Sequence, residues 1–133
     1  MDAPPIVDPP SLRAHLFGPF RLEVAGVVIP DRTWPRRSAR ALLILLLVTP
    51  GHRLPRDRVL DLLWPDASPR SGDGALRKAV HALRRVLQPD LRDGRASAFL
   101  EVGAETVALR TELDLWLDID TFEAELAKAR ASP

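Results

Sequence analysis

Residues 71–88, SGDGALRKAVHALRRVLQ, alternate apolar and cationic side chains at helical spacing, and they constrain the fold more than any other run of the chain. The apolar side chains recur every three or four residues and therefore share one face of a helix: Leu76, Ala79, Val80, Leu83, Val86 and Leu87. The cationic side chains point mostly elsewhere: Arg77, Lys78, His81, Arg84 and Arg85. Such a helix docks its apolar face on a small core, and its basic face suits either solvent or the phosphates and base edges of a duplex groove.

Length and composition narrow the class of protein. A chain of 133 residues suits one small domain with extensions. It has no cysteine, so disulfides and thiolate metal sites are excluded and a reducing compartment is indicated. The longest apolar run, residues 41–48, is too short to cross a bilayer, and the N-terminus lacks the pattern of a signal peptide. We therefore expect a cytoplasmic protein with no membrane partner.

The net charge of +1 conceals a strong asymmetry along the chain. Residues 1–31 carry a net charge of −2, residues 32–95 carry +8, and residues 96–133 carry −5. The middle segment has 14 basic side chains, of which 13 are arginines. Arginine combines bidentate contacts to phosphate and to guanine, so this segment is expected to attract a polyanion.

Hydrophobic periodicity and turn residues predict the order of the elements. Short strands are expected over residues 12–17, 20–24 and 27–29, with a tight turn at Ala25-Gly26 between the last two. A helix is expected to begin near Pro35, with a basic first turn that opposes the helix dipole and invites an anion, and to be buried all round in its second half.

A short second helix follows over residues 55–64, and the long amphipathic helix comes next. Either Ser71 or Asp73 is expected to cap that helix, while Gly72 and Gly74 predict that it frays or starts late. A polar loop at residues 91–96 leads to a β-hairpin over residues 98–109, and a last helix begins near Asp118 or Asp120.

Strands, three helices and a hairpin in this order predict an α+β fold of the winged helix-turn-helix type. The three-helix core would carry an N-terminal antiparallel β-sheet and a C-terminal β-hairpin wing over residues 98–110. The third helix then occupies the position of a major-groove reader.

The chain resembles the winged-helix DNA-binding domain of OmpR/PhoB-type regulators, and more closely that of the antibiotic-regulatory (SARP-type) activators. The similar stretches are LFGPFRLEVAGVVIP, RRSARALLILLLVTPGHRLPRDRVLDLLWPD, LRKAVHALRRVL and LWLDIDTFEAEL, which together cover roughly residues 12–127. The resemblance implies a disordered Pro-rich tail at 1–11, the DNA-binding domain at 12–112, and a linker with the first helix of a truncated activator-type domain at 113–133.

The resemblance also implies roles for individual residues. The side chains expected to contact bases are Lys78, His81, Arg85 and Arg77. The side chains expected to contact phosphates are Arg36, Arg37, Arg40, Arg84 and Arg110. Gly72, Gly74 and Ala82 depart from the family pattern, so specific base readout is expected to be thin. The implied partners are double-stranded DNA, RNA polymerase, and a C-terminal activator or effector domain.

Other chemistry is poorly supported by the residues. The chain has no Gly-rich phosphate loop and no G-x-S-x-G motif, so no enzymatic activity, cofactor or small-molecule substrate is expected. The three histidines lack ligand-spaced partners for a metal. Asp114, Asp118 and Asp120 fit helix capping and a solvated face better than acid–base work. The alternative function is a protein-interaction module with little DNA affinity, suggested by the acidic and apolar segment 112–126.

Overall fold

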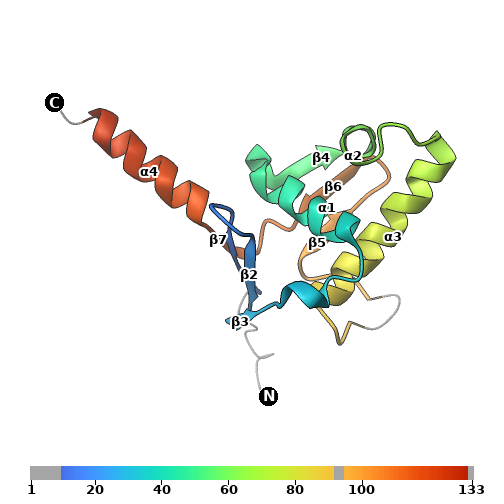
Figure 1. Cartoon of the computed structure of the whole chain (residues 1–133), viewed down its shortest axis with the longest axis horizontal. Coiled ribbons are helices and arrows are strands. Elements are labelled where there is room, and N and C mark those ends of the chain that lie inside the picture. Colours follow the sequence, from blue (N-terminus) through green and yellow to red (C-terminus); the bar gives the residue numbers. More distant parts are fainter. Residues whose placement is uncertain (1–9, 92–94, 132–133) are drawn as a thin grey trace, which may run out of the picture. The chain divides into compact units, whose positions relative to one another are not determined.

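The computed structural model describes residues 10–91 and 95–131, and these residues form a mixed α+β structure (Figure 1). The chain divides into two compact units. One unit joins the two ends of the sequence, Met1–Val28 and Glu112–Pro133, and the other is Ile29–Thr111. Within the described residues, every helix is too short or too polar to cross a lipid bilayer.

The unit formed by the two ends of the sequence contains a four-stranded sheet and one helix. The sheet has the order β3-β2-β1-β7, with strands β1 (Ser11–His15), β2 (Arg21–Val24), β3 (Val27–Val28) and β7 (Asp114–Leu117). Strands β1, β2 and β3 are antiparallel neighbours, whereas β7 runs parallel to β1 with Leu12 opposite Leu115. Helix α4 (Asp118–Ala131) follows β7 directly. The expected antiparallel N-terminal strands are therefore present, and a parallel strand from the far end of the sequence extends their sheet.

A two-residue turn at Ala25-Gly26 joins β2 to β3, as the sequence predicts. Ala25 has φ 50° and Gly26 has φ 81°, and Val24 pairs directly with Val27. Positive φ at both central residues is the geometry that matches the right-handed twist of a hairpin. Glycine adopts a positive φ without strain, whereas the Cβ of Ala25 makes a positive φ unfavourable at that residue.

Asp118 ties the start of α4 to the end of β1. Its carboxylate accepts hydrogen bonds from the backbone N–H of Leu16 at 2.9 and 3.0 Å and from that of Phe17 at 3.0 Å. Burial raises the pKa of this carboxyl, but these amides, the Ile119 amide and the nearby His15 lower it by more, so the pKa lies below its ordinary 3.8. Phe17 also meets Phe122 of α4 edge to face at 5.3 Å.

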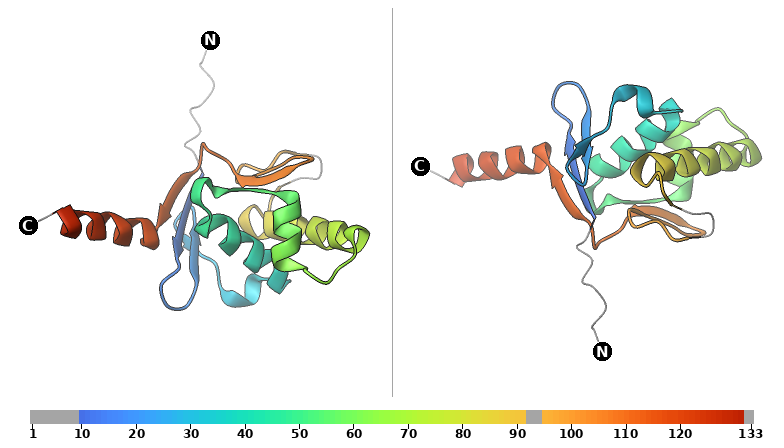
Figure 2. Two further views of the ribbon diagram at one scale, coloured as in Figure 1. Left: turned by 90° about the horizontal axis from the view of Figure 1, so that it is seen from above. Right: turned by 90° about the horizontal axis from the view of Figure 1, so that it is seen from below.

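The central unit consists of three helices and a three-stranded antiparallel sheet. The helices are α1 (Arg37–Val48), α2 (Arg56–Leu63) and α3 (Pro69–Leu87). The sheet has the order β4-β6-β5, with strands β4 (Arg53–Pro55), β5 (Leu100–Val102) and β6 (Thr106–Leu109). Two 3-10 turns, η1 (Asp31–Thr33) and η2 (Pro50–His52), flank α1. Figure 2 shows the β5–β6 hairpin, in orange, along one side of the helices of this unit.

The core of the central unit lies where α1 packs on α3 and α2, and where α2 packs on β6. Its fully buried side chains are mainly leucine and valine: Leu42, Leu43, Leu46, Leu47, Val59, Leu76, Leu83, Leu100 and Val107. The prediction that the second half of α1 is buried all round is wrong, because Val48 is 49% exposed and Ile44 and Leu45 are half-buried. Helix α1 also begins at Arg37 rather than near Pro35.

Helix α3 begins earlier than the sequence analysis predicts. Ser68 is its N-cap, and the Ser68 hydroxyl accepts a hydrogen bond from the Ser71 N–H at 3.3 Å. Pro69 occupies the first turn, where its fixed φ suits a helix. The predicted caps Ser71 and Asp73 are therefore wrong, and the helix continues through Gly72 and Gly74.

Two strands were not predicted, and both lie next to a predicted neighbour. Strand β7 occupies most of residues 113–117, which the resemblance assigns to a linker. Strand β4 pairs with β6 immediately before α2, and its Pro55 stands opposite Thr106. Ser11, expected in the disordered tail, belongs to β1. The rest of that tail except Pro10, and part of the loop at 91–96, lie outside the described residues.

Candidate nucleic-acid interface

Helix α3 presents four of its basic side chains to solvent. Arg77, Lys78, His81 and Arg85 are all exposed, whereas the apolar positions of the helix are buried as their spacing predicts. Because Arg77, His81 and Arg85 are separated by four residues each, they lie one above the other along the helix. The four predicted base-contacting residues therefore share one exposed face.

The packing of α3 on its neighbours fixes the direction of this face. Helix α3 contacts both α1 and α2, and its first turns approach α2 closely at Gly72. A Cβ at Gly72 would lie 3.4 Å from the side chain of Leu60, so the absence of a side chain lets the two helices approach. With the apolar face held in this way, the cations cannot turn inward without exposing the core.

A hollow of about 470 Å³ lies between α3 and the segment that enters α1; we call it the α1–α3 hollow. Its lining residues are Pro35, Arg36, Arg77, Lys78, His81, Ala82 and Arg85. The structure thus brings one predicted phosphate-contacting residue, Arg36, to all four predicted base-contacting residues. None of the lining residues is acidic, so the hollow is cationic.

A second hollow, of about 410 Å³, extends this surface toward the N-terminus of α3. It shares Arg36 and Lys78 with the first and adds Ser38, Trp64, Arg70, Ser71, Gly74 and Ala75. Arg70 is a cation that the sequence analysis missed. The signal was Ser68-Pro69, an N-cap followed by proline at the first helical position, which places Arg70 in the helix.

The cations that line these two hollows have no ion-pair partner within residues 10–91 and 95–131: Arg36, Arg70, Arg77, Lys78 and Arg85. The first turn of α1 beside them has no acidic residue and no side-chain cap. Its free N–H groups and the helix dipole favour an anion at this end. Arg37 is exposed in the same turn. The surface therefore lacks the negative charge that would balance it from within the described chain.

Three predicted phosphate-contacting residues lie differently. Arg40 is half-buried. Arg84 is also half-buried, and its Nε is enclosed without a hydrogen-bond partner among the described residues. Arg110 donates its Nε–H to the carbonyl oxygen of Ser97 at 2.6 Å, which holds residues before β5 against the end of β6. None of these three lines either of the two hollows.

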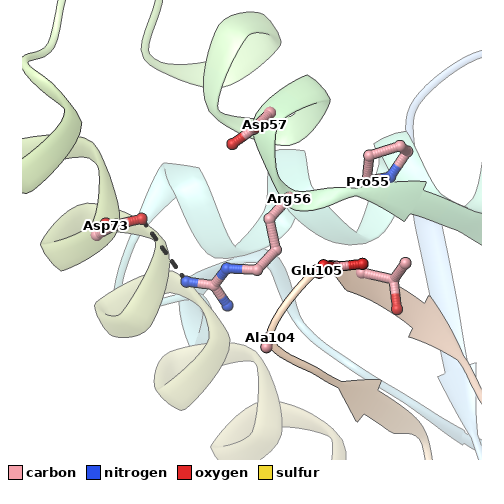
Figure 3. Close-up of a pocket in the computed structure, with 7 residues that line it drawn as sticks. Pro55, Arg56, Asp57, Asp73, Ala104 and Glu105 are labelled. Atoms are coloured by element: carbon pink, nitrogen blue, oxygen red, sulfur yellow. Dashed lines mark ion pairs between the residues drawn. The ribbon is translucent and has the colours of Figure 1, made fainter.

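Three acidic residues of the central unit, Asp57, Asp73 and Glu105, line a further hollow of about 860 Å³ (Figure 3). There the Arg56 guanidinium pairs with Asp73 at 3.8 Å, and the Arg56 N–H donates to the carbonyl oxygen of Glu105 at 2.8 Å. Asp57 lines the same hollow. Arg56 thus links the start of α2 to the first turns of α3 and to the tip of the β5–β6 hairpin.

Two tryptophans, Trp64 and Trp116, are packed against other residues of the protein. Trp64 is half-buried and lines the second hollow. Trp116 lies in β7, where the Arg13 guanidinium covers its ring at 4.5 Å and the His15 ring approaches at 5.0 Å. Within the described ranges, no three His, Asp or Glu side chains are grouped closely enough to hold a metal ion.

No protein-family model and no curated protein sequence matches the chain.

Proposed function

We propose that the chain binds double-stranded DNA through α3, and that Ile29–Thr111 is a winged helix-turn-helix of the OmpR and SARP type. The observation that carries this proposal is the α1–α3 hollow. Four cations from two elements, Arg36, Arg77, Lys78 and Arg85, surround it without an ion-pair partner among the described residues. Neutralising phosphates by such side chains supplies most of the affinity of DNA-binding proteins.

The dimensions of α3 support insertion into the major groove. Arg77 and Arg85 are eight residues apart, which is about 12 Å along a helix axis. The major groove is about 12 Å wide and admits a helix whose diameter with side chains is about 10–12 Å, so this face of α3 can lie along its floor. A turn joins α2 to α3, and the β5–β6 hairpin follows α3, as in a helix-turn-helix with a wing.

The proposal assigns base contacts and phosphate contacts to different residues. Arg77, Lys78, His81 and Arg85 face the bases from α3. Arg36 and Arg37, at the start of α1, contact phosphates together with Arg70. Arg110 is proposed to hold the hairpin through Ser97 rather than to touch DNA. The proposed role is transcriptional regulation in the cytoplasm, with RNA polymerase or an activator domain as further partners and with no catalytic step.

Direct binding to DNA tests this proposal. We expect a labelled random-sequence duplex to bind the wild-type chain at 50 mM salt, and Arg77→Ala/Arg85→Ala to weaken binding at least tenfold. The control Arg21→Ala/Arg130→Ala removes the same charge from exposed positions in the other unit, and it should bind within twofold of wild type. Equal losses in both double variants would show that net charge, and not the surface of α3, attracts the DNA.

A second candidate function is protein interaction through the unit that contains α4. Phe17 and Phe122 are each 54% exposed and in ring contact, and Leu126 is 37% exposed on the same helix. Exposed apolar side chains that gather in this way mark protein contacts. Light scattering of wild type and Phe122→Ser/Leu126→Ser tests it, because self-association would give a larger mass for wild type only. A monomeric wild type that also fails to bind DNA at low salt would leave both candidates unsupported.

A further inference from the structure

The wall of the α1–α3 hollow differs in chemistry from its rim. Ala82 lines it from α3 with only 6% of its surface exposed, and Pro35 lines it from the segment before α1. Neither side chain has a hydrogen-bonding group. The aliphatic stems of Arg77, Lys78 and Arg85 add further carbon beneath their charged ends. A cationic rim therefore surrounds an apolar floor.

Such a floor selects among the groups that DNA presents in the major groove. A base edge with an amino or carbonyl group placed against Ala82 would lose water without gaining a hydrogen bond, which is unfavourable. The C5-methyl group of thymine is the apolar group exposed there. The cations of the rim attract phosphates and guanine edges on either side, while the floor is left for a methyl group.

We propose that Ala82, together with Pro35, reads a thymine through its methyl group. This inference rests on the proposed function, because it assumes that α3 enters the major groove. Ala82 follows His81 and precedes Arg85 by three residues, so the thymine lies beside the base pairs that those two side chains contact. Ala82 is then a specificity-determining residue.

Replacing thymine by deoxyuridine tests the proposal, because this change removes only the methyl group. A binding site is first selected from random duplexes with the wild-type chain, and each thymine in it is then replaced singly. At one thymine we expect affinity to fall about fourfold, which corresponds to ~0.8 kcal/mol for one buried methyl group. The other positions should change less than twofold.

Two variants locate the contact on α3. Ala82→Ser places a hydroxyl on the floor, and it should bring the preference for thymine over deoxyuridine within twofold. The hydroxyl can donate to the carbonyl four residues earlier, which destabilises a helix only slightly. The matched control Ala129→Ser makes the same change at an exposed position of α4, outside the proposed interface, and should keep the fourfold preference.

Each outcome decides the proposal. A fourfold loss at one thymine that disappears in Ala82→Ser supports it. Selected DNA that binds equally well with every thymine replaced, or a preference that persists in Ala82→Ser, overturns it while DNA binding stands. Absence of binding to any duplex at 50 mM salt overturns the proposed function, and this inference with it. If Ala82→Ser fails to fold, Pro35→Ser changes the other apolar residue of the floor, which is exposed, and it should likewise bring the preference within twofold; a preference that persists there overturns the proposal.

Discussion

Arg85→Ala separates base readout from general attraction to DNA. Arg85 is exposed, and none of the described residues forms an ion pair with it. Because no described residue forms an ion pair with this side chain, its removal should change the free energy of unfolding by less than about 0.5 kcal/mol. Any larger loss of DNA affinity then reports the contact with DNA and not damage to the fold.

The magnitude follows from the contact that an exposed arginine can make in the major groove. A bidentate arginine–guanine pair contributes about 1–3 kcal/mol of discrimination. We therefore expect Arg85→Ala to raise the Kd for a selected site about 5- to 160-fold. The Kd for a scrambled duplex of the same length should rise much less, because only one charge is lost.

Arg37→Ala is the matched comparison, since it also removes one exposed arginine, but from the first turn of α1. It should weaken selected and scrambled duplexes equally and reduce the salt slope by about one. Fluorescence anisotropy measures the Kd of wild type and of each variant for the selected and the scrambled duplex. An Arg85→Ala variant that loses the same factor on selected and scrambled DNA would refute the assignment of base readout to Arg85.

Three further predictions concern the fold. Gly74→Ala should raise the free energy of unfolding in urea by about 1 kcal/mol, because a Cβ there meets nothing within 4 Å; a loss of stability would contradict the helical geometry of this turn. Ala25→Gly should stabilise the β2–β3 hairpin by about 0.5–1 kcal/mol, because φ is 50° at this alanine, and an unchanged midpoint would argue against the turn. The Asp118 carboxylate stabilises the fold above its unfolded pKa, and this contribution is lost as the pH falls below about 4 through its lower folded pKa. The amide chemical shifts of Leu16 and Phe17 should follow that titration in wild type but not in Asp118→Asn. Amide shifts that do not depend on pH in wild type would exclude the contact.

Local patterns in the sequence predicted the elements whose stability is local. The face of α3 followed from the spacing of Leu76, Leu83 and their neighbours, because a helix places such residues together wherever it lies in the fold. The turn at Ala25-Gly26 was also predicted from the local sequence, because positive φ is a property of the two residues themselves.

The pairing of strands that are distant in the sequence could not be predicted from local patterns. Strand β7 has only four residues, and its partner β1 lies about one hundred residues earlier in the chain. Strand β4 has three residues and ends in a proline, which usually excludes a strand. Both are defined by a neighbouring strand and not by their own periodicity.

The candidate site was predicted only in part, because some of its residues are positioned by local periodicity and others by packing between helices. The exposed cations of α3 followed from its periodicity, whereas the convergence of Arg36 on the same hollow depends on how α1 packs on α3. The hydrogen bond of Arg110 to the Ser97 carbonyl could not be predicted, because it depends on the path of the chain before β5, which no sequence pattern shows.

The salt dependence of binding to a random-sequence duplex tests the central claim most directly. The exposed cations of α1, of its N-cap and of α3 are Arg36, Arg37, Arg70, Arg77, Lys78 and Arg85. If three to five of them contact phosphates, the slope of log Kobs against log salt concentration should lie between about −2.7 and −4.5 from 50 to 200 mM. A slope near zero, or no binding at 50 mM, would contradict the proposal that this surface binds DNA.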